Sequence, residues 1–246
     1  MNFKIGVAQI ASEAGEVDLN LEAHMDAIKV AARSNISFLV FPELSLIGYE
    51  PMISQDLAFS ANDQRLFVLQ IAAREHGLHV VAGAPISTNN LPYIGSFIFS
   101  PDGGVRTYAK MHLHPAEEKY FSPCMSYALV SVSECTIANA ICADMNTTEH
   151  VRDCVERGAD IYISGAMITR NGYSKDTEVL KGYAWDYGIL VGMANQNSHS
   201  SNGLSCGKSA IWGPSGLLAQ ANETQSAIVA AQQAPEGWTA EVIEVY

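Results

Sequence analysis

Short apolar runs alternate with amphipathic segments along this chain, and that alternation limits its fold more than any other feature. A continuous apolar run such as residues 36–41 is typical of a strand that is covered on both faces. Residues 20–33 carry apolar side chains at helical spacing and predict a helix. Alternating strands and helices imply a layered α/β fold. The predicted strands are 4–10, 36–41, 79–85, 93–100, 105–110, 136–142, 160–164, 189–194, 208–212 and 217–221, and the predicted helices are 20–33, 63–76, 148–157 and 175–187.

The second half of the chain repeats the element order of the first. Each half has a turn rich in Pro and Gly between two strand-like runs, at residues 101–104 and 213–216. These hairpins imply a mixed sheet in each half. Since no linker rich in Pro, Gly or Ser separates the halves, we expect a single domain over residues 1–246 with internal pseudo-symmetry. The tail, residues 235–246, is apolar and aromatic, and we expect it to dock on another surface, with a partner subunit as the candidate.

Charge and composition exclude several classes of partner. Only 16% of residues are charged and 48% are hydrophobic, which favours a compact globular body over disorder. A net charge of −12 argues against nucleic acid and anionic membrane, because both need a basic face. The chain shows no signal-peptide pattern and no apolar stretch near the roughly 20 residues of a membrane span. Five cysteines without close pairs fit reduced thiols, so we expect a cytoplasmic protein.

Three side chains with complementary chemistry stand at the ends of predicted strands: Glu43, Lys110 and Cys142. Taken singly, each has a structural interpretation, as a loop glutamate, a solvated lysine or an inert core cysteine. Taken together, they supply the parts that a thiol nucleophile needs. A carboxylate can accept the thiol proton, and an ammonium can stabilise negative charge on a substrate oxygen.

The segments around these residues resemble the motifs of the nitrilase superfamily of carbon–nitrogen hydrolases. Residues 41–49 are similar to its glutamate motif, residues 108–113 to its lysine motif and residues 141–144 to its cysteine motif. Their order and broad spacing match as well, and the resemblance runs from residue 4 to about residue 231. It implies a four-layer α-β-β-α sandwich built on two mixed β-sheets.

The resemblance also implies a role for each residue. Glu43 is then the general base, Lys110 stabilises the oxyanion, and Cys142 forms a thioester with the substrate. Many family members have a second active-site glutamate, and Glu117 fits that position, with its neighbour Glu118 as the alternative.

Two further residues are candidates for contact with the substrate. The backbone N–H of Ala143 is a second oxyanion donor, and its small side chain replaces the tyrosine that the family often has there. Tyr49 could form a wall of the pocket, although an ordinary half-buried tyrosine is an equally good interpretation.

The expected function is hydrolysis of a small amide, of the amidase, ω-amidase or N-carbamoyl-amide hydrolase type, in a homodimer or larger homo-oligomer. Acyl transfer from the same thioester is one alternative, and a non-catalytic binding or scaffold protein that retains the fold is another.

We expect no metal or cofactor. His112 and His114 lack a third ligand at a motif spacing, with His150 and His199 remote in sequence, so we interpret them as surface histidines. The glycine-rich residues 203–209 have one residue too few for a phosphate-binding loop.

Overall fold

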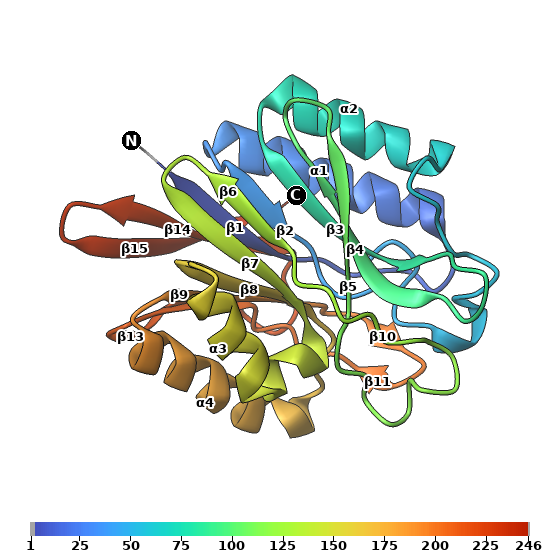
Figure 1. Ribbon diagram of the computed structural model, residues 1–246. Helices are drawn as coiled ribbons and strands as arrows, with labels where there is room; N and C mark the ends of the chain where they lie inside the picture. The colour runs from blue at the N-terminus through green and yellow to red at the C-terminus, as the bar shows by residue number, and fades with distance from the viewer. Residues whose placement is uncertain (1–2, 246) are drawn as a thin grey trace.

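The computed structural model describes residues 3–245 and has four layers. Two β-sheets pack face to face, with one pair of helices over the first sheet and another pair over the second (Figure 1). The α-β-β-α sandwich expected from the sequence is therefore confirmed. The helices are α1 (Val17–Arg33), α2 (Phe67–His76), α3 (Thr148–Glu156) and α4 (Arg170–Tyr187).

Sheet A has seven strands in the order β15-β14-β1-β2-β3-β4-β5. Its centre, β1-β2-β3, is parallel, and the strands on either side pair antiparallel. It is therefore a mixed sheet. Its strands are β1 (Lys4–Gln9), β2 (Phe38–Val40), β3 (His79–Ile86), β4 (Tyr93–Phe99), β5 (Val105–Ala109), β14 (Ala227–Ala234) and β15 (Gly237–Glu244).

Sheet B repeats this plan with six strands in the order β13-β12-β9-β8-β7-β6. Three parallel strands again form the centre, between antiparallel partners. Its strands are β6 (Leu129–Val132), β7 (Cys135–Ile141), β8 (Ile161–Ala166), β9 (Leu190–Asn195), β12 (Ala210–Gly213) and β13 (Gly216–Gln220). The remaining short elements are the β10 (His199–Ser200) and β11 (Gly203–Leu204) hairpin and three 3₁₀ turns, η1 (Pro51–Ile53), η2 (Gln64–Leu66) and η3 (Cys142–Asn146).

The two faces of sheet B belong to different cores. Ile137 and Ile141 of β7 join the core that also contains the strands of sheet A. Ala138 and Ala140, which alternate with them, join the core beneath α3 and α4. This alternation follows from the two-residue repeat of a strand.

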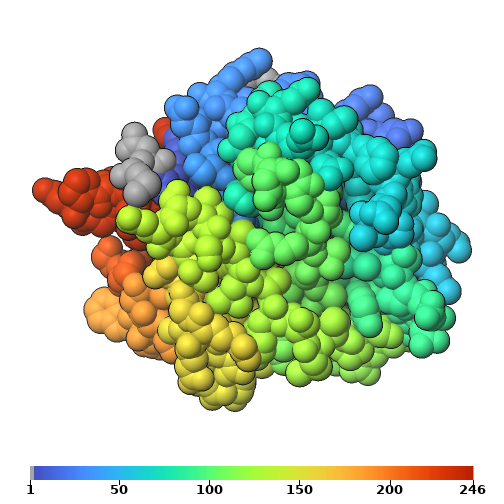
Figure 2. Space-filling view, turned by 45° about the horizontal axis from the view of Figure 1, so that its top comes forward, coloured from blue at the N-terminus to red at the C-terminus, as the bar shows by residue number. Residues whose placement is uncertain are grey.

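Most of the C-terminal tail forms a strand of sheet A. Residues 237–244 form β15, which pairs along its length with β14 of the same chain. The turn end of the β14–β15 hairpin, coloured red, projects from the body at the left of Figures 1 and 2, whereas residues 227–232 of β14 pair with β1. The expected contact with a partner subunit stays a prediction.

Within residues 3–245, none of the helices combines the length and the apolar character that crossing a bilayer requires.

Candidate active site

The loop that carries Glu43 follows β2 and lies between the two sheets. On one side is Gly83 of β3, where an added Cβ would stand 2.3 Å from the Pro42 oxygen. On the other is Gly165 of β8, where a Cβ would stand 2.7 Å from the Phe41 oxygen. Both distances are shorter than real Cβ contacts, so only glycine allows the loop to pass so close to each strand.

A buried serine–histidine pair supports the same loop. Ser45 Oγ accepts a hydrogen bond from the Gly83 N–H at 3.3 Å and lies 2.9 Å from His24 Nε2. His24 Nδ1 lies 2.6 Å from the carbonyl oxygen of Asn20, so Nδ1 carries the proton and Nε2 accepts from Ser45. Burial lowers the pKa of His24 to about 4, which keeps the ring neutral. The loop geometry is thus fixed by groups that do not titrate near neutral pH.

Lys110 lies directly after β5 and is completely buried. Its ammonium donates to Glu43 Oε1 at 2.7 Å and to Glu117 Oε1 and Oε2 at 2.8 and 2.9 Å. Tyr49 donates its hydroxyl to Glu117 Oε1 at 2.6 Å. Glu118 is exposed to solvent, so of the two neighbouring glutamates the structure places Glu117 at the site.

Cys142 begins η3 immediately after β7, and its φ of 42° is in the left-handed region. The predicted strand included Cys142, but β7 ends at Ile141 because the backbone turns sharply at the cysteine. The Cys142 N–H donates to Ser164 Oγ at 3.1 Å. A non-glycine residue in this conformation is strained, and such strain is frequent where a reactive side chain must be held at a defined angle.

One oxygen of the Glu43 carboxyl is left free by residues 3–245, and the Cys142 thiol is close to the same carboxyl. Glu43 Oε2 is buried and accepts no hydrogen bond from any residue in the described part of the chain. The Cys142 thiol is close enough to this carboxyl to oppose, in small part, the rise in its pKa that burial causes. Ala143 follows in the first turn of η3, where backbone N–H groups have no partner within the helix. Among the described residues, the site therefore has one buried acceptor, Glu43 Oε2, that no protein group occupies.

Burial dominates the electrostatics of these groups. Loss of solvent raises the pKa of Glu43 to about 7, although the Lys110 ammonium opposes that shift. Burial and the Glu43 charge also raise the pKa of the Cys142 thiol well above its usual value. Burial lowers the pKa of Lys110, but the adjacent carboxylates outweigh it and raise the pKa overall. Near neutral pH the site thus holds a protonated thiol, an ammonium and a carboxyl able to exchange a proton.

The surface interpretation of His112 was wrong, because its ring is two-thirds buried and Nδ1 lies 3.1 Å from Asp144 Oδ1. His150 is fully buried, and the centroids of the His112 and His150 rings are 5.8 Å apart, although the two residues are remote in sequence. His114 is exposed, as expected. Among residues 3–245, His, Cys, Asp and Glu side chains form no group of three that could hold a metal ion.

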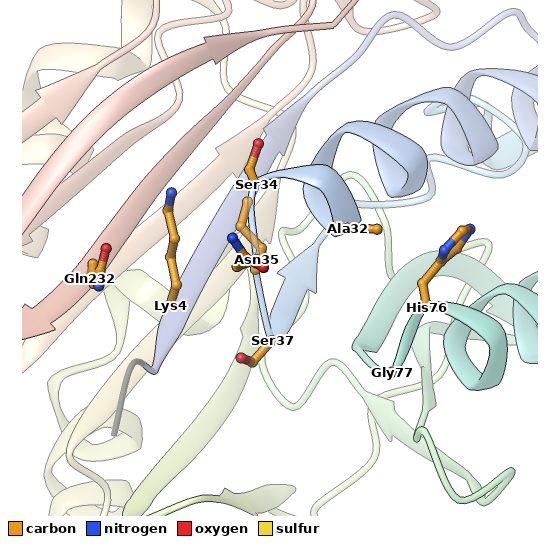
Figure 3. Close-up of a pocket in the computed structure, with 9 residues that line it drawn as sticks. Lys4, Ala32, Ser34, Asn35, Ser37, His76, Gly77 and Gln232 are labelled. Atoms are coloured by element: carbon orange, nitrogen blue, oxygen red, sulfur yellow. The ribbon is translucent and has the colours of Figure 1, made fainter.

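An open cavity of about 590 Å³ lies at the end of sheet A that is opposite the candidate active site (Figure 3). Lys4 on β1 and Gln232 on β14 line it, together with the C-terminal ends of α1 and α2. Lys4 and Ser37 lie at the amino ends of β1 and β2, whereas Glu43 follows the carboxyl end of β2. The Lys4 ammonium is already paired with Glu241 at 2.6 Å. This cavity is therefore separate from the candidate active site.

A family model described as carbon-nitrogen hydrolase matches residues 4–240, nearly the whole chain. The chain belongs to the carbon-nitrogen hydrolase family. The resemblance to the nitrilase superfamily is thereby confirmed.

Curated members of this family include amidases and nitrilases. The chain is 30% identical over 163 residues to an (R)-stereoselective amidase of Pseudomonas sp., a match that covers 65% of this chain and 59% of that protein. It is 24% identical over 164 residues to a nitrilase of Pyrococcus abyssi, covering 64% and 62%. The chain thus spans about three-fifths of the length of these relatives.

Solved structures show the same fold. An amidase from Nesterenkonia sp. AN1 superposes with a TM-score of 0.87 at 23% identity, covering 95% of this chain and 94% of that one. A mutant of that amidase in complex with butyramide superposes with a TM-score of 0.86. At this identity the likeness establishes the arrangement of layers and strands.

Proposed function

We propose that this chain hydrolyses the C–N bond of a small amide through a thioester on Cys142. One observation carries the proposal: a single buried ammonium, Lys110, joins Glu43 to Glu117, and the Cys142 thiol is close to the Glu43 carboxyl, one oxygen of which has no partner among the described residues. Buried charges are costly unless they are paired and used, so this arrangement favours catalysis over a scaffold role. Relatives named as amidases, including a 2-oxoglutaramate amidase of Bacillus subtilis at 27% identity, support the same reaction class.

The first half of the reaction forms the thioester. Glu43 accepts the thiol proton while Cys142 Sγ bonds to the amide carbonyl carbon, and the π electrons of the carbonyl move to its oxygen. The Lys110 ammonium and the Ala143 N–H stabilise that oxyanion, a contribution of about 3–4 kcal/mol for each donor. Protonated Glu43 then gives its proton to the amide nitrogen, the C–N bond breaks, and the amine leaves.

The second half releases the acid. Glu43, now a carboxylate again, accepts a proton from water while the water oxygen bonds to the thioester carbon. When the tetrahedral species collapses, the C–S bond breaks, and the proton on Glu43 returns to the sulfur. A base with a pKa of about 7 suits both proton transfers, because it can accept and donate near neutral pH.

Glu117 and Tyr49 hold the cation in place. Both oxygens of Glu117 accept from Lys110, and the Tyr49 hydroxyl and the His114 N–H bind those same oxygens. With its acceptors filled in this way, Glu117 fixes where the ammonium meets the developing oxyanion. Tyr49 then serves as a support for Glu117 and borders the substrate pocket.

We also propose a cytoplasmic homo-oligomer. All five cysteines are free in the described residues, which fits a reducing compartment. The β14–β15 hairpin, which contains most of the tail, is the expected contact with a partner subunit. Light scattering on the full chain, compared with a chain shortened at residue 235, tests that contact; an unchanged mass would remove the hairpin from the interface.

The decisive experiment measures ammonia release from a panel of aliphatic amides, ω-amides and N-carbamoyl compounds. Cys142→Ala should abolish release, while Cys124→Ala, a change at a half-buried cysteine without these partners, should retain it. Adding hydroxylamine and measuring hydroxamate separates acyl transfer from hydrolysis. Ammonia release that survives in Cys142→Ala would refute the mechanism, and no release by wild type from any compound would refute the amidase function.

A further inference from the structure

A buried carboxylate two residues after Cys142 connects the segments that carry the reactive groups. Asp144 is completely buried within η3. Its two oxygens accept five hydrogen bonds, more than the roughly four lone-pair positions of a carboxylate, so none of these positions is left without a donor. The donors are the Tyr108 hydroxyl at 2.6 Å, the backbone N–H groups of Met111, His112 and Ile141 at 3.1, 2.9 and 3.0 Å, and the His112 ring Nδ1 at 3.1 Å.

These donors flank both reactive residues. Tyr108 and Met111 lie on either side of Lys110, which follows β5 of sheet A. Ile141 and Asp144 itself lie on either side of Cys142, which follows β7 of sheet B. One carboxylate therefore links the backbone beside the ammonium to the backbone beside the thiol, across the boundary between the two sheets.

The side chain is held as an anion that can only accept. Burial acts to raise the pKa of Asp144, but the hydrogen bond from His112, the neighbouring His150 and the hydrogen bond from Tyr108 together outweigh burial, and the pKa lies below its usual value. The hydrogen bond to Asp144 raises the pKa of His112, so the pair carries opposite charges in weakly acidic solution. Tyr108 also bonds His150 at 3.0 Å, which fixes the direction of its hydroxyl.

We infer that Asp144 is a positioning residue that sets the separation between the Lys110 ammonium and the Cys142 thiol, with His112 as its supporting donor. This inference rests on the proposed function. Asp144 touches neither Lys110 Nζ nor Cys142 Sγ, and it acts through the backbone on each side of them. The oxyanion requires its donors at a defined distance from the attacked carbon, and a displacement of about 1 Å can cost about 100-fold in rate.

Asp144→Asn is the direct test, because it preserves shape while placing an NH₂ group opposite backbone N–H donors. We expect kcat to fall about 100-fold with KM within about threefold, since the defect affects the transition state more than binding. We also expect slower alkylation of Cys142 by iodoacetamide, followed by peptide mass spectrometry. Asp153→Asn is the matched control. Asp153 accepts a hydrogen bond from the Tyr127 hydroxyl at 2.7 Å, and the Tyr127 ring packs on His150, but Asp153 binds neither of the segments that carry Lys110 and Cys142. It should retain wild-type kcat.

His112 provides a second test if Asp144→Asn fails to fold. His112→Asn keeps an N–H donor near the Nδ1 position, whereas His112→Ala removes it. We therefore expect His112→Asn to retain at least tenfold more kcat than His112→Ala at equal melting temperature. Equal kcat in the two variants would overturn the role of His112.

For Asp144→Asn, a lower melting temperature with wild-type kcat and alkylation rate would overturn the positioning role and leave a structural one. The alkylation rate does not depend on turnover. If wild type releases no ammonia from any amide, the proposed function fails, and the alkylation comparison still decides whether Asp144 positions the thiol.

Discussion

Glu43→Gln should make the protein more stable at alkaline pH while it abolishes turnover. The carboxyl of Glu43 is fully buried, one of its oxygens has no protein partner in the described residues, and burial raises its pKa from 4.5 to about 7. Between these two values the folded chain binds a proton that the unfolded chain has released. The free energy of unfolding of the wild type therefore falls as pH rises through this window.

The shift fixes the size of the effect. At 1.36 kcal/mol for each pKa unit, the full change is about 3 kcal/mol, and most of it lies between pH 5 and pH 8. Glutamine has almost the same shape and does not titrate, so this part of the pH dependence should be absent from Glu43→Gln. The stability of the variant relative to wild type should thus rise by about 2–3 kcal/mol from pH 5 to pH 8.

Urea unfolding of both proteins at pH 5, 6, 7 and 8 measures this difference directly. Glu118→Gln is the matched control, because it makes the same change at an exposed glutamate next to Glu117. It should show no pH-dependent difference in stability from wild type. Parallel pH profiles for wild type and Glu43→Gln would show that the Glu43 carboxyl keeps its ordinary pKa in the folded protein. The assignment of Glu43 as a base that works near neutral pH would then be wrong.

Three further changes test the site. Lys110→Met leaves two buried carboxylates without their cation, so the free energy of unfolding in urea should fall by about 3–5 kcal/mol; an unchanged midpoint would contradict the pairing. Tyr49→Phe removes a donor to Glu117 and should lower the same quantity by about 2 kcal/mol; no loss would mean that this hydrogen bond does not form in solution. Gly83→Ala adds a Cβ 2.3 Å from the loop of the proposed base and should lower kcat about 100-fold. Gly182→Ala is the control, because its added Cβ meets no atom within 4 Å. Equal kcat in the two alanine variants would show that the Gly83 Cβ does not displace the Glu43 loop.

Periodicity predicted the parallel centre of each sheet and the two hairpins that follow it, β4–β5 and β12–β13, but it gave no sign of β6, β14 or β15. The continuous apolar runs correspond to β1, β2 and β3 and to β7, β8 and β9, because parallel strands are covered on both faces. No strand was predicted over the residues of β14, although β14 pairs with β1 in the interior of sheet A. Its residues Ala227–Ala234 are mostly Ala and Gln, which have little intrinsic preference for strands, so tertiary packing determines their conformation.

For the site, the order of the motifs predicted which residues take part, but the distances between their side chains could be known only from the structure. Glu43 and Lys110 are 67 residues apart in sequence and 2.7 Å apart in space. Sequence could not separate Glu117 from Glu118, since the choice depends on which side chain the turn directs inward. Asp144 lies within the cysteine motif, residues 141–144, but its partner Tyr108 is 36 residues away. No periodic pattern in the sequence predicts that the two side chains form a hydrogen bond. The positive φ of Cys142 had no signal in the residue types around it.

The placement of the reactive groups on two sheets has a consequence for how the molecule is assembled. Glu43 and Lys110 follow strands of sheet A, and Cys142 follows a strand of sheet B. Neither half of the chain can therefore hold a working thiol during synthesis or refolding. The proposed nucleophile meets its proposed base only when the two sheets pack on each other and exclude water from the lysine. Recovered activity in a refolding experiment would consequently report that step, and the chain stays catalytically inactive until both sheets are in place.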